Sequence, residues 1–214
     1  MNRLKAFISY SARQQEIGGR FKHCLEHYCG YEVFIAHNDM PAASFFPEEI
    51  IKAIQNTDFF IPLLSEDFKS SDYSDQETGA AVILKKKIIP IKLKHVNPYG
   101  LISQIHALQY KETLESPNSP NNVKELVLTI AQIGLRVEQY HEQSIESLIY
   151  AFCNSSSFES TNATIQIMLN YDHFTDNQLK QIISAIQSNW EIKGAFGLPT
   201  LKSFLRDKYK VSVD

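Results

Sequence analysis

Short apolar segments alternate with amphipathic segments along the first two-thirds of this chain, and that alternation restricts its possible folds more than any other feature. The short segments are rich in β-branched and aromatic residues, which is typical of buried strands. They lie at residues 6–10, 32–36, 59–64, 88–93 and 107–110. Because helical segments separate successive strands, we expect parallel pairing with right-handed crossovers.

The segments between the strands carry the end signals of helices. Helices are predicted at residues 15–29, from Pro47 onward, at 75–86 and at 123–139. Gly30 suits the end of the first helix, and Pro47 suits a first helical position. Pro90 indicates that the fourth strand lies at an edge or ends there. The strand order resembles a flavodoxin-like sheet, so the predicted class is α/β, with five parallel strands and a ligand site beyond their carboxyl ends.

The strand pattern stops at about residue 140. Four helices are predicted beyond it, at residues 145–153, 161–169, 177–190 and 200–209. Thr175 and Asp176 supply an N-cap signal for the third of these helices. We therefore expect an α/β domain over residues 1–138 and a small all-α bundle over residues 139–214.

Composition excludes several classes of protein. The chain has 214 residues, of which 43% are hydrophobic, and a net charge of −3, so no basic excess points to nucleic acid or an anionic membrane. The longest apolar runs fall short of the roughly 20 residues that a membrane span needs. Three cysteines without a C-x-x-C pair fit free thiols. With no signal-peptide pattern, the expected location is the cytoplasm.

Three familiar kinds of site find no support in the sequence. Gly18 and Gly19 lie inside a helical pattern and lack the spacing of a phosphate-binding loop. The seven histidines are scattered, and no third ligand joins His23 and His27, so no metal site is expected. A phospho-acceptor receiver domain would need carboxylates after the first strand, where this chain has Ser9, Tyr10 and Ser11.

A set of five short blocks resembles the TIR (Toll/interleukin-1 receptor) domain. The blocks occur in order at residues 7–11 (FISYS), 33–39 (VFIAHND), 50–58 (IIKAIQNTD), 60–65 (FIPLLS) and 88–91 (IIPI). The resemblance covers about residues 1–138. It implies cleavage of NAD by one glutamate, which in the family closes a W-x-x-x-E pattern after the third strand. Here Tyr73 replaces the tryptophan and Glu77 keeps the spacing.

The chemistry that the resemblance implies needs a fixed carboxylate. Cleavage of the nicotinamide–ribose bond passes through an oxocarbenium-like state, as in glycoside hydrolysis. A carboxylate can hold the ribose hydroxyls and stabilise the developing positive charge. We expect the nearby helix N-terminus to keep Glu77 ionised. The alternative is structural, because Ser74 and Glu77 also have the spacing of a capping box, and the two roles can coexist.

The resemblance implies further residues around the nucleotide. Phe46 could stack on a base, Arg13 could meet the pyrophosphate, and Asp39 could orient a ribose hydroxyl or the loop at residues 37–46, which corresponds to the family's BB loop. The predicted binding residues are Ser9, Tyr10, Ser11, Arg13, Asp39, Phe46 and Tyr73. For Phe46 the alternative is packing on the core, and for Arg13 and Asp39 it is an exposed position in solvent.

The resemblance thus implies a cytoplasmic NAD⁺ glycohydrolase that forms ADP-ribose or a cyclic ADP-ribose isomer, with NAD⁺ as substrate and no cofactor. It implies activation by self-association of TIR domains and a role in bacterial antiphage defence, with the helical tail serving assembly, regulation or a protein partner. A non-catalytic TIR scaffold, or a protein that interferes with host signalling, is the main alternative. Tyr73 in place of tryptophan and Ala42-Ala43 in place of glycine favour it. A nucleoside-processing α/β enzyme is a third possibility.

Overall fold

The computed structural model describes residues 2–35, 46–111, 120–171 and 173–211. The chain divides into two compact units. The sheet unit comprises residues 4–23 and 32–126, and the helical unit comprises residues 1–3, 24–31 and 127–214. Among the described residues, none of the helices combines the length and the apolar character that crossing a membrane requires.

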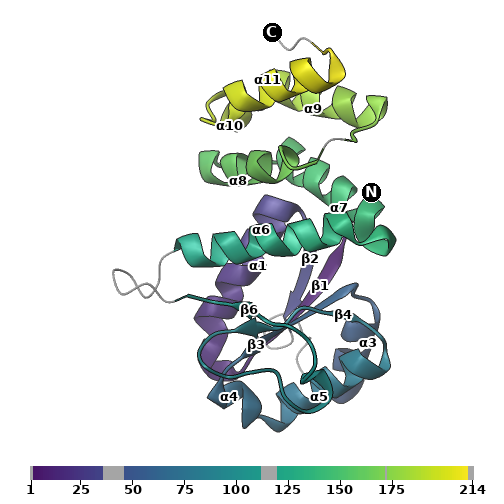
Figure 1. The fold of residues 1–214 in the computed structure, drawn as a ribbon, viewed down its shortest axis with the longest axis vertical. Helices are drawn as coiled ribbons and strands as arrows, with labels where there is room; N and C mark the ends of the chain where they lie inside the picture. Colours follow the sequence, from purple (N-terminus) through teal and green to yellow (C-terminus); the bar gives the residue numbers. More distant parts are fainter. Residues whose placement is uncertain (1, 36–45, 112–119, 172, 212–214) are drawn as a thin grey trace. The chain divides into compact units, whose positions relative to one another are not determined.

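The sheet unit is built around parallel strands in the order β2-β1-β3-β5-β6, with β4 also paired to β3 (Figure 1). The strands are β1 (Lys5–Ser9), β2 (Glu32–Ile35), β3 (Phe59–Leu64), β4 (Lys87–Ile88), β5 (Ile91–Lys92) and β6 (Leu108–Gln109). This arrangement confirms the predicted α/β class and its flavodoxin-like strand order. All six residues of β3 are buried, as expected for a strand that is covered on both faces.

The predicted fourth strand is divided into β4 and β5. Both segments pair with β3 in one continuous register, in which Leu63 lies opposite Ile91, so Pro62 lies opposite Pro90. Neither proline has an amide hydrogen to donate, and the ladder is interrupted where the two face each other. Pro90 therefore ends a strand segment, as predicted, while β5 itself lies between β3 and β6.

Helix α5 (Asp72–Ile83) is the element that carries Glu77, and it packs against β1, β3, α3 and the short elements α4 and η2. The prediction began this helix at residue 75, but it begins three residues earlier because Ser71 caps it. The other helical elements of the sheet unit are η1 (Ala12–Gln14), α1 (Gln15–Cys29), α3 (Phe46–Gln55), α4 (Glu66–Lys69) and η2 (Gly100–Ile102). The end of α1 belongs to the helical unit. The start of α6 (Pro120–Arg136) belongs to the sheet unit.

An aromatic and aliphatic core fills the space between the sheet and the helices α3 and α5. Phe7 of β1 is fully buried in it and stacks on Phe60 of β3, with the ring centroids 5.6 Å apart. The remaining buried members are Ile50, Ile54, Leu64, Phe68, Ala81, Ile88, Val96 and Ile102. Burial of these side chains provides the hydrophobic stabilisation that holds α5 on the ends of β1 and β3.

The helical unit consists of helices that bury apolar side chains, among them Leu148, Phe152 and Ile165. The helices are α7 (Glu138–Cys153), α8 (Phe158–Met168), α9 (Asp176–Ser188), α10 (Trp190–Lys193) and α11 (Leu198–Tyr209). Helix α8 packs against α7, α10 and α11. The predicted N-cap at Thr175 is present, with its hydroxyl accepting a hydrogen bond from the Gln178 amide at 3.4 Å.

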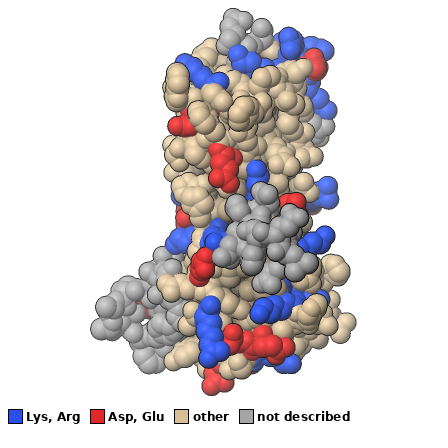
Figure 2. Space-filling model, turned by 90° about the vertical axis from the view of Figure 1, so that its left-hand side faces the viewer, with Lys and Arg blue, Asp and Glu red and all other residues tan. Residues whose placement is uncertain are grey.

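Acidic and basic side chains lie interspersed on the described surface that Figure 2 shows.

Candidate active site

Glu77 lies where the order of the strands reverses. The chain passes from β1 to β2 on one side and then returns to β3 on the other side, so β1 and β3 flank the topological switch point. Open α/β sheets bind ligands in the crevice at this point, outside the carboxyl ends of the strands. Ser9 is the last residue of β1 and pairs with Pro62 of β3. Glu77 reaches the same place from the second turn of α5.

The Glu77 carboxyl group is buried and contacts Ser9. Glu77 is 6% exposed and Ser9 is 1% exposed. The Ser9 hydroxyl donates a hydrogen bond to Glu77 Oε2. Burial raises the pKa of Glu77 from 4.5 to about 7, and the hydrogen bond from Ser9 opposes that rise.

The raised pKa corrects the expectation that the helix N-terminus keeps Glu77 ionised. The field of a helix end falls off within the first turn, and Glu77 lies in the second turn of α5. Loss of hydration therefore outweighs the helix dipole. Near neutral pH the group exists in both protonation states, which suits a residue that exchanges a proton during a reaction.

The capping-box interpretation of Ser74 and Glu77 is wrong. The N-cap of α5 is Ser71, whose hydroxyl oxygen accepts a hydrogen bond from the Ser74 amide at 3.4 Å. Ser74 lies inside the helix and is buried. The Glu77 side chain turns to β1 and does not return to the start of its own helix. The start of α5 therefore needs no contribution from Glu77.

Two other polar residues of α5 lie outside this contact. Tyr73, one turn before Glu77, is 56% exposed. Asp75 accepts a hydrogen bond from the Tyr99 hydroxyl at 2.9 Å. Asp75 and Glu77 therefore do not form an acid–base pair, in agreement with the spacing of the two residues along the helix.

The residues that follow β1 are used in local packing. The buried Tyr10 ring lies against Gly18 of α1, so close that a Cβ atom on Gly18 would stand 2.5 Å from Tyr10 Cε1. The Ser11 hydroxyl donates to Gln14 Oε1 at 3.1 Å, and the Ser11 amide donates to the same oxygen at 3.3 Å. These contacts hold the η1 turn at the carboxyl end of β1.

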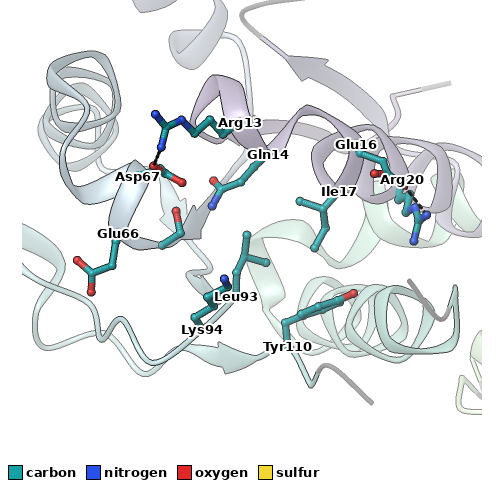
Figure 3. Close-up of a pocket in the computed structure, with 11 residues that line it drawn as sticks. Arg13, Gln14, Glu16, Ile17, Arg20, Glu66, Asp67, Leu93, Lys94 and Tyr110 are labelled. Carbon is teal, nitrogen blue, oxygen red and sulfur yellow. Dashed lines mark hydrogen bonds and ion pairs between the residues drawn. The ribbon is translucent and has the colours of Figure 1, made fainter. Parts of the chain in front are cut away.

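Arg13 lines a cavity of about 370 Å³ that lies at the carboxyl ends of the strands, next to η1 and the start of α1 (Figure 3). Its guanidinium pairs with Asp67 at 2.8 Å, and Arg20 pairs with Glu16 at 2.7 Å. The cavity is lined by Arg13, Gln14, Glu16, Ile17, Arg20, Ser65, Glu66, Asp67, Leu93, Lys94 and Tyr110. Its lining carries balanced charge, and neither Ser9 nor Glu77 contributes to it.

The structure thus brings Glu77 and Ser9 together and places Arg13 at a cavity that neither of them lines. Apart from Arg13, the residues that line the cavity were not among the predicted site residues, although Ser65, Leu93 and Tyr110 each follow directly after a strand. Position after a strand was the signal that could have found them.

Asp39 and the Phe46 side chain lie outside the described residues. In the described part of the chain, no group of three or more His, Cys, Asp or Glu residues could hold a metal ion.

A parallel sheet in flavodoxin-like order, with a buried glutamate at its switch point, defines an open α/β domain, a class of fold that places its ligand sites at the carboxyl ends of the strands. A family model, that of the TIR domain, matches residues 6–127, which is more than half of the chain. The chain belongs to the TIR domain family.

Two solved structures are similar to this chain. The TIR domain of the Toll-related receptor TRR-2 from Hydra magnipapillata is 22% identical, with 49% of this chain and 82% of that chain covered and a TM-score of 0.45. The CMP N-glycosidase BcmB of Clostridium botulinum is 19% identical, with 58% of this chain and 98% of that chain covered and a TM-score of 0.40. No curated protein matches the sequence.

Proposed function

We propose that this TIR-domain protein is an NAD⁺ glycohydrolase in which Glu77 is the catalytic residue. It releases nicotinamide and forms ADP-ribose or a cyclic ADP-ribose isomer. The observation that supports this proposal is the burial of Glu77 at the switch point of a TIR domain, with its carboxyl group directed to the end of β1. Strongly shifted pKa values of buried carboxyl groups in such positions are characteristic of functional sites.

The proposed reaction breaks the bond between the nicotinamide nitrogen and the ribose C1′. The bonding electrons leave with nicotinamide, which departs as a neutral molecule, and the ribose acquires oxocarbenium character. The ionised Glu77 carboxylate stabilises that positive charge. Water then attacks C1′ and gives up a proton, which Glu77 can accept because its pKa is about 7. Attack by an adenine nitrogen in place of water gives the cyclic isomer.

Assembly and biological setting belong to the same proposal. TIR domains generally self-associate, and we propose that copies of this chain must assemble before they cleave NAD⁺. Activity would then rise more steeply than the protein concentration. The proposed setting is the bacterial cytoplasm, where depletion of NAD⁺ or production of a nucleotide signal serves antiphage defence, with the helical unit supporting assembly or a regulatory partner.

The test is nicotinamide release from NAD⁺ by concentrated protein, followed by chromatography. We expect release by the native protein and a loss of about a hundredfold or more in Glu77→Gln, which keeps the size of the side chain but cannot carry the negative charge. The matched control is Asp75→Asn, which neutralises an exposed carboxylate two residues away on the same helix and should retain activity. Equal background release by the native protein and Glu77→Gln, with crowding agents present, would refute the enzyme and favour a TIR scaffold.

A further inference from the structure

We infer that Ser9 is a positioning residue, whose buried hydroxyl holds the Glu77 carboxyl group in one orientation at the ends of β1 and β3. Ser9 was predicted from the sequence to bind the substrate, whereas here Ser9 acts through Glu77. It rests on the proposed function, since the orientation matters for catalysis only if Glu77 is the catalytic residue.

The backbone of β1 determines where the Ser9 side chain points. Side chains alternate between the faces of a strand, so Ser9 shares a face with Phe7, which is buried in the core beneath α3 and α5. Pairing of β1 with β3 extends to Ser9 itself, which lies opposite Pro62. The hydroxyl is therefore presented to α5 from a fixed strand position, and Glu77 Oε2 receives its hydrogen bond.

A serine hydroxyl has a single hydrogen to donate. Here that hydrogen is directed to Glu77 Oε2, and Ser9 is 1% exposed. A substrate hydroxyl or phosphate could therefore receive it only if the contact with Glu77 were broken. Breaking it would leave a buried carboxylate without this donor, which carries a desolvation penalty. The geometry thus favours a role through Glu77 over direct binding of the substrate.

The hydrogen bond also influences the charge state of Glu77. Burial raises the pKa of Glu77 and the Ser9 hydrogen bond lowers it, so removal of the hydroxyl leaves burial unopposed and raises the pKa further. Within the described part of the chain, burial and the Ser9 hydrogen bond are the two influences on this pKa. Among the described residues, the other titratable groups on α5 and on the elements packed against it are Lys5, Glu48, Glu49, Lys52, Glu66, Asp67, Lys69, Asp72, Tyr73 and Asp75. Tyr10 directly follows β1, and Tyr99 directly precedes η2.

The first test is the pH profile of nicotinamide release. If the ionised carboxylate is the active form, the acid limb of the native profile has its midpoint near pH 7. In Ser9→Ala we expect the midpoint to rise by about one pH unit, which lowers the rate about fivefold at pH 7 and restores it near pH 9. Ser9→Thr keeps a hydroxyl on the same strand position and should return the midpoint toward the native value.

The second test uses the pH dependence of stability and needs no turnover. Equilibrium unfolding of the native protein, Ser9→Ala, Glu77→Gln and the double variant is measured between pH 5 and pH 9. The pKa of Glu77 in the folded state is expected to be higher in Ser9→Ala than in the native protein. The stability of the Ser9→Ala variant should therefore keep falling above pH 7, where the contribution of Glu77 to the stability of the native protein has levelled off. In the Glu77→Gln background, the effect of Ser9→Ala should not depend on pH.

Thr57→Val is the matched control for both tests. It removes another buried hydroxyl of the sheet unit, one that donates to the Ile54 carbonyl at 2.9 Å and does not contact Glu77. Its effect on stability should be the same at every pH. An unchanged midpoint in Ser9→Ala, or a pH-dependent effect that persists in the Glu77→Gln background, would overturn the role of Ser9. A different outcome is that the four proteins show the expected pH-dependent stabilities while the native protein releases no nicotinamide. That outcome would refute the proposed enzymatic activity, and with it a catalytic role for the contact between Ser9 and Glu77.

Discussion

At the scale of single residues, Glu77 carries a cost that the fold alone does not require. A carboxyl group that is 6% exposed loses most of its hydration, and the hydrogen bond from Ser9 compensates for this loss only in part, as the raised pKa of about 7 indicates. An apolar or amide side chain would avoid this penalty. Groups that destabilise the folded state in this way are concentrated at functional sites.

We predict that Glu77→Gln stabilises the protein at pH 8. The folded pKa lies above the unfolded value of 4.5, so the unfolded chain releases the Glu77 proton first. The contribution of Glu77 to native stability should therefore fall as the pH rises from about 4.5 to about 7 and then level off. The substitution removes this loss, which is on the order of 3 kcal/mol at pH 8 and vanishes near pH 4. Urea unfolding of both proteins at the two pH values measures the difference.

Glu48→Gln is the control for that measurement, because Glu48 is an exposed glutamate on the neighbouring helix α3. An exposed carboxylate keeps its hydration, so this substitution should change stability by only a few tenths of a kcal/mol, similarly at both pH values. If Glu77→Gln behaved like Glu48→Gln, Glu77 would not be buried as the structure has it.

At the scale of elements, α1 and the end of β1 fit together through a glycine. Helix α1 contains Gly18 and Gly19 side by side, and a glycine inside a helix costs about 1 kcal/mol relative to alanine. Only Gly18 has a packing reason, since the buried Tyr10 ring occupies the space that its Cβ atom would need. A Cβ atom on Gly19 would meet no atom within 4 Å.

We predict opposite effects for alanine at these two neighbouring positions. Gly19→Ala should stabilise the protein by about 0.5–1 kcal/mol, because it improves helix propensity without a clash. Gly18→Ala should destabilise it by about 1–3 kcal/mol, because the Tyr10 ring is buried and has little room to move. Thermal unfolding of the two variants measures both effects. Equal stabilisation by both substitutions would show that Tyr10 does not pack against α1.

The boundaries of elements show where sequence patterns were sufficient. Helix α1 and strand β3 match their predicted limits of residues 15–29 and 59–64, because strong apolar spacing and Gly30 delimit them. The prediction missed α4 and began α5 too late. Several serines in succession offer competing caps there, and the packing of α5 against β1 and β3 decides in favour of Ser71.

At the scale of the whole molecule, the candidate catalytic group and the two most exposed aromatic side chains of the described residues lie in different units. The carboxylate site and the cavity lie in the sheet unit. The helical unit exposes aromatic side chains, with Trp190 76% and Phe196 90% exposed. Single exposed aromatic residues are common on protein surfaces, and Trp190 offers a spectroscopic probe of whether another surface covers this part of the helical unit.

We predict that the fluorescence of Trp190, the single tryptophan of the chain, reports an indole in water when the protein is dilute. Its emission should be strongly red-shifted and readily quenched by acrylamide, because 76% of the residue is exposed. Trp190→Phe should abolish the signal and leave thermal stability nearly unchanged, since little apolar surface is lost from the core. A blue-shifted and protected emission in dilute protein would show that another surface covers this residue.

The sequence by itself determined the order of the strands, their parallel pairing and the position of Glu77 after β3. Apolar runs of strand length separated by helices have few ways to bury themselves, so pattern was enough. Only the tertiary structure decided that Glu77 meets Ser9, 68 residues earlier in the chain, that burial raises the pKa of Glu77, and that Arg13 lines a cavity to which Glu77 does not contribute. Burial and contacts between distant segments arise from packing in three dimensions, and no local pattern in the sequence encodes them.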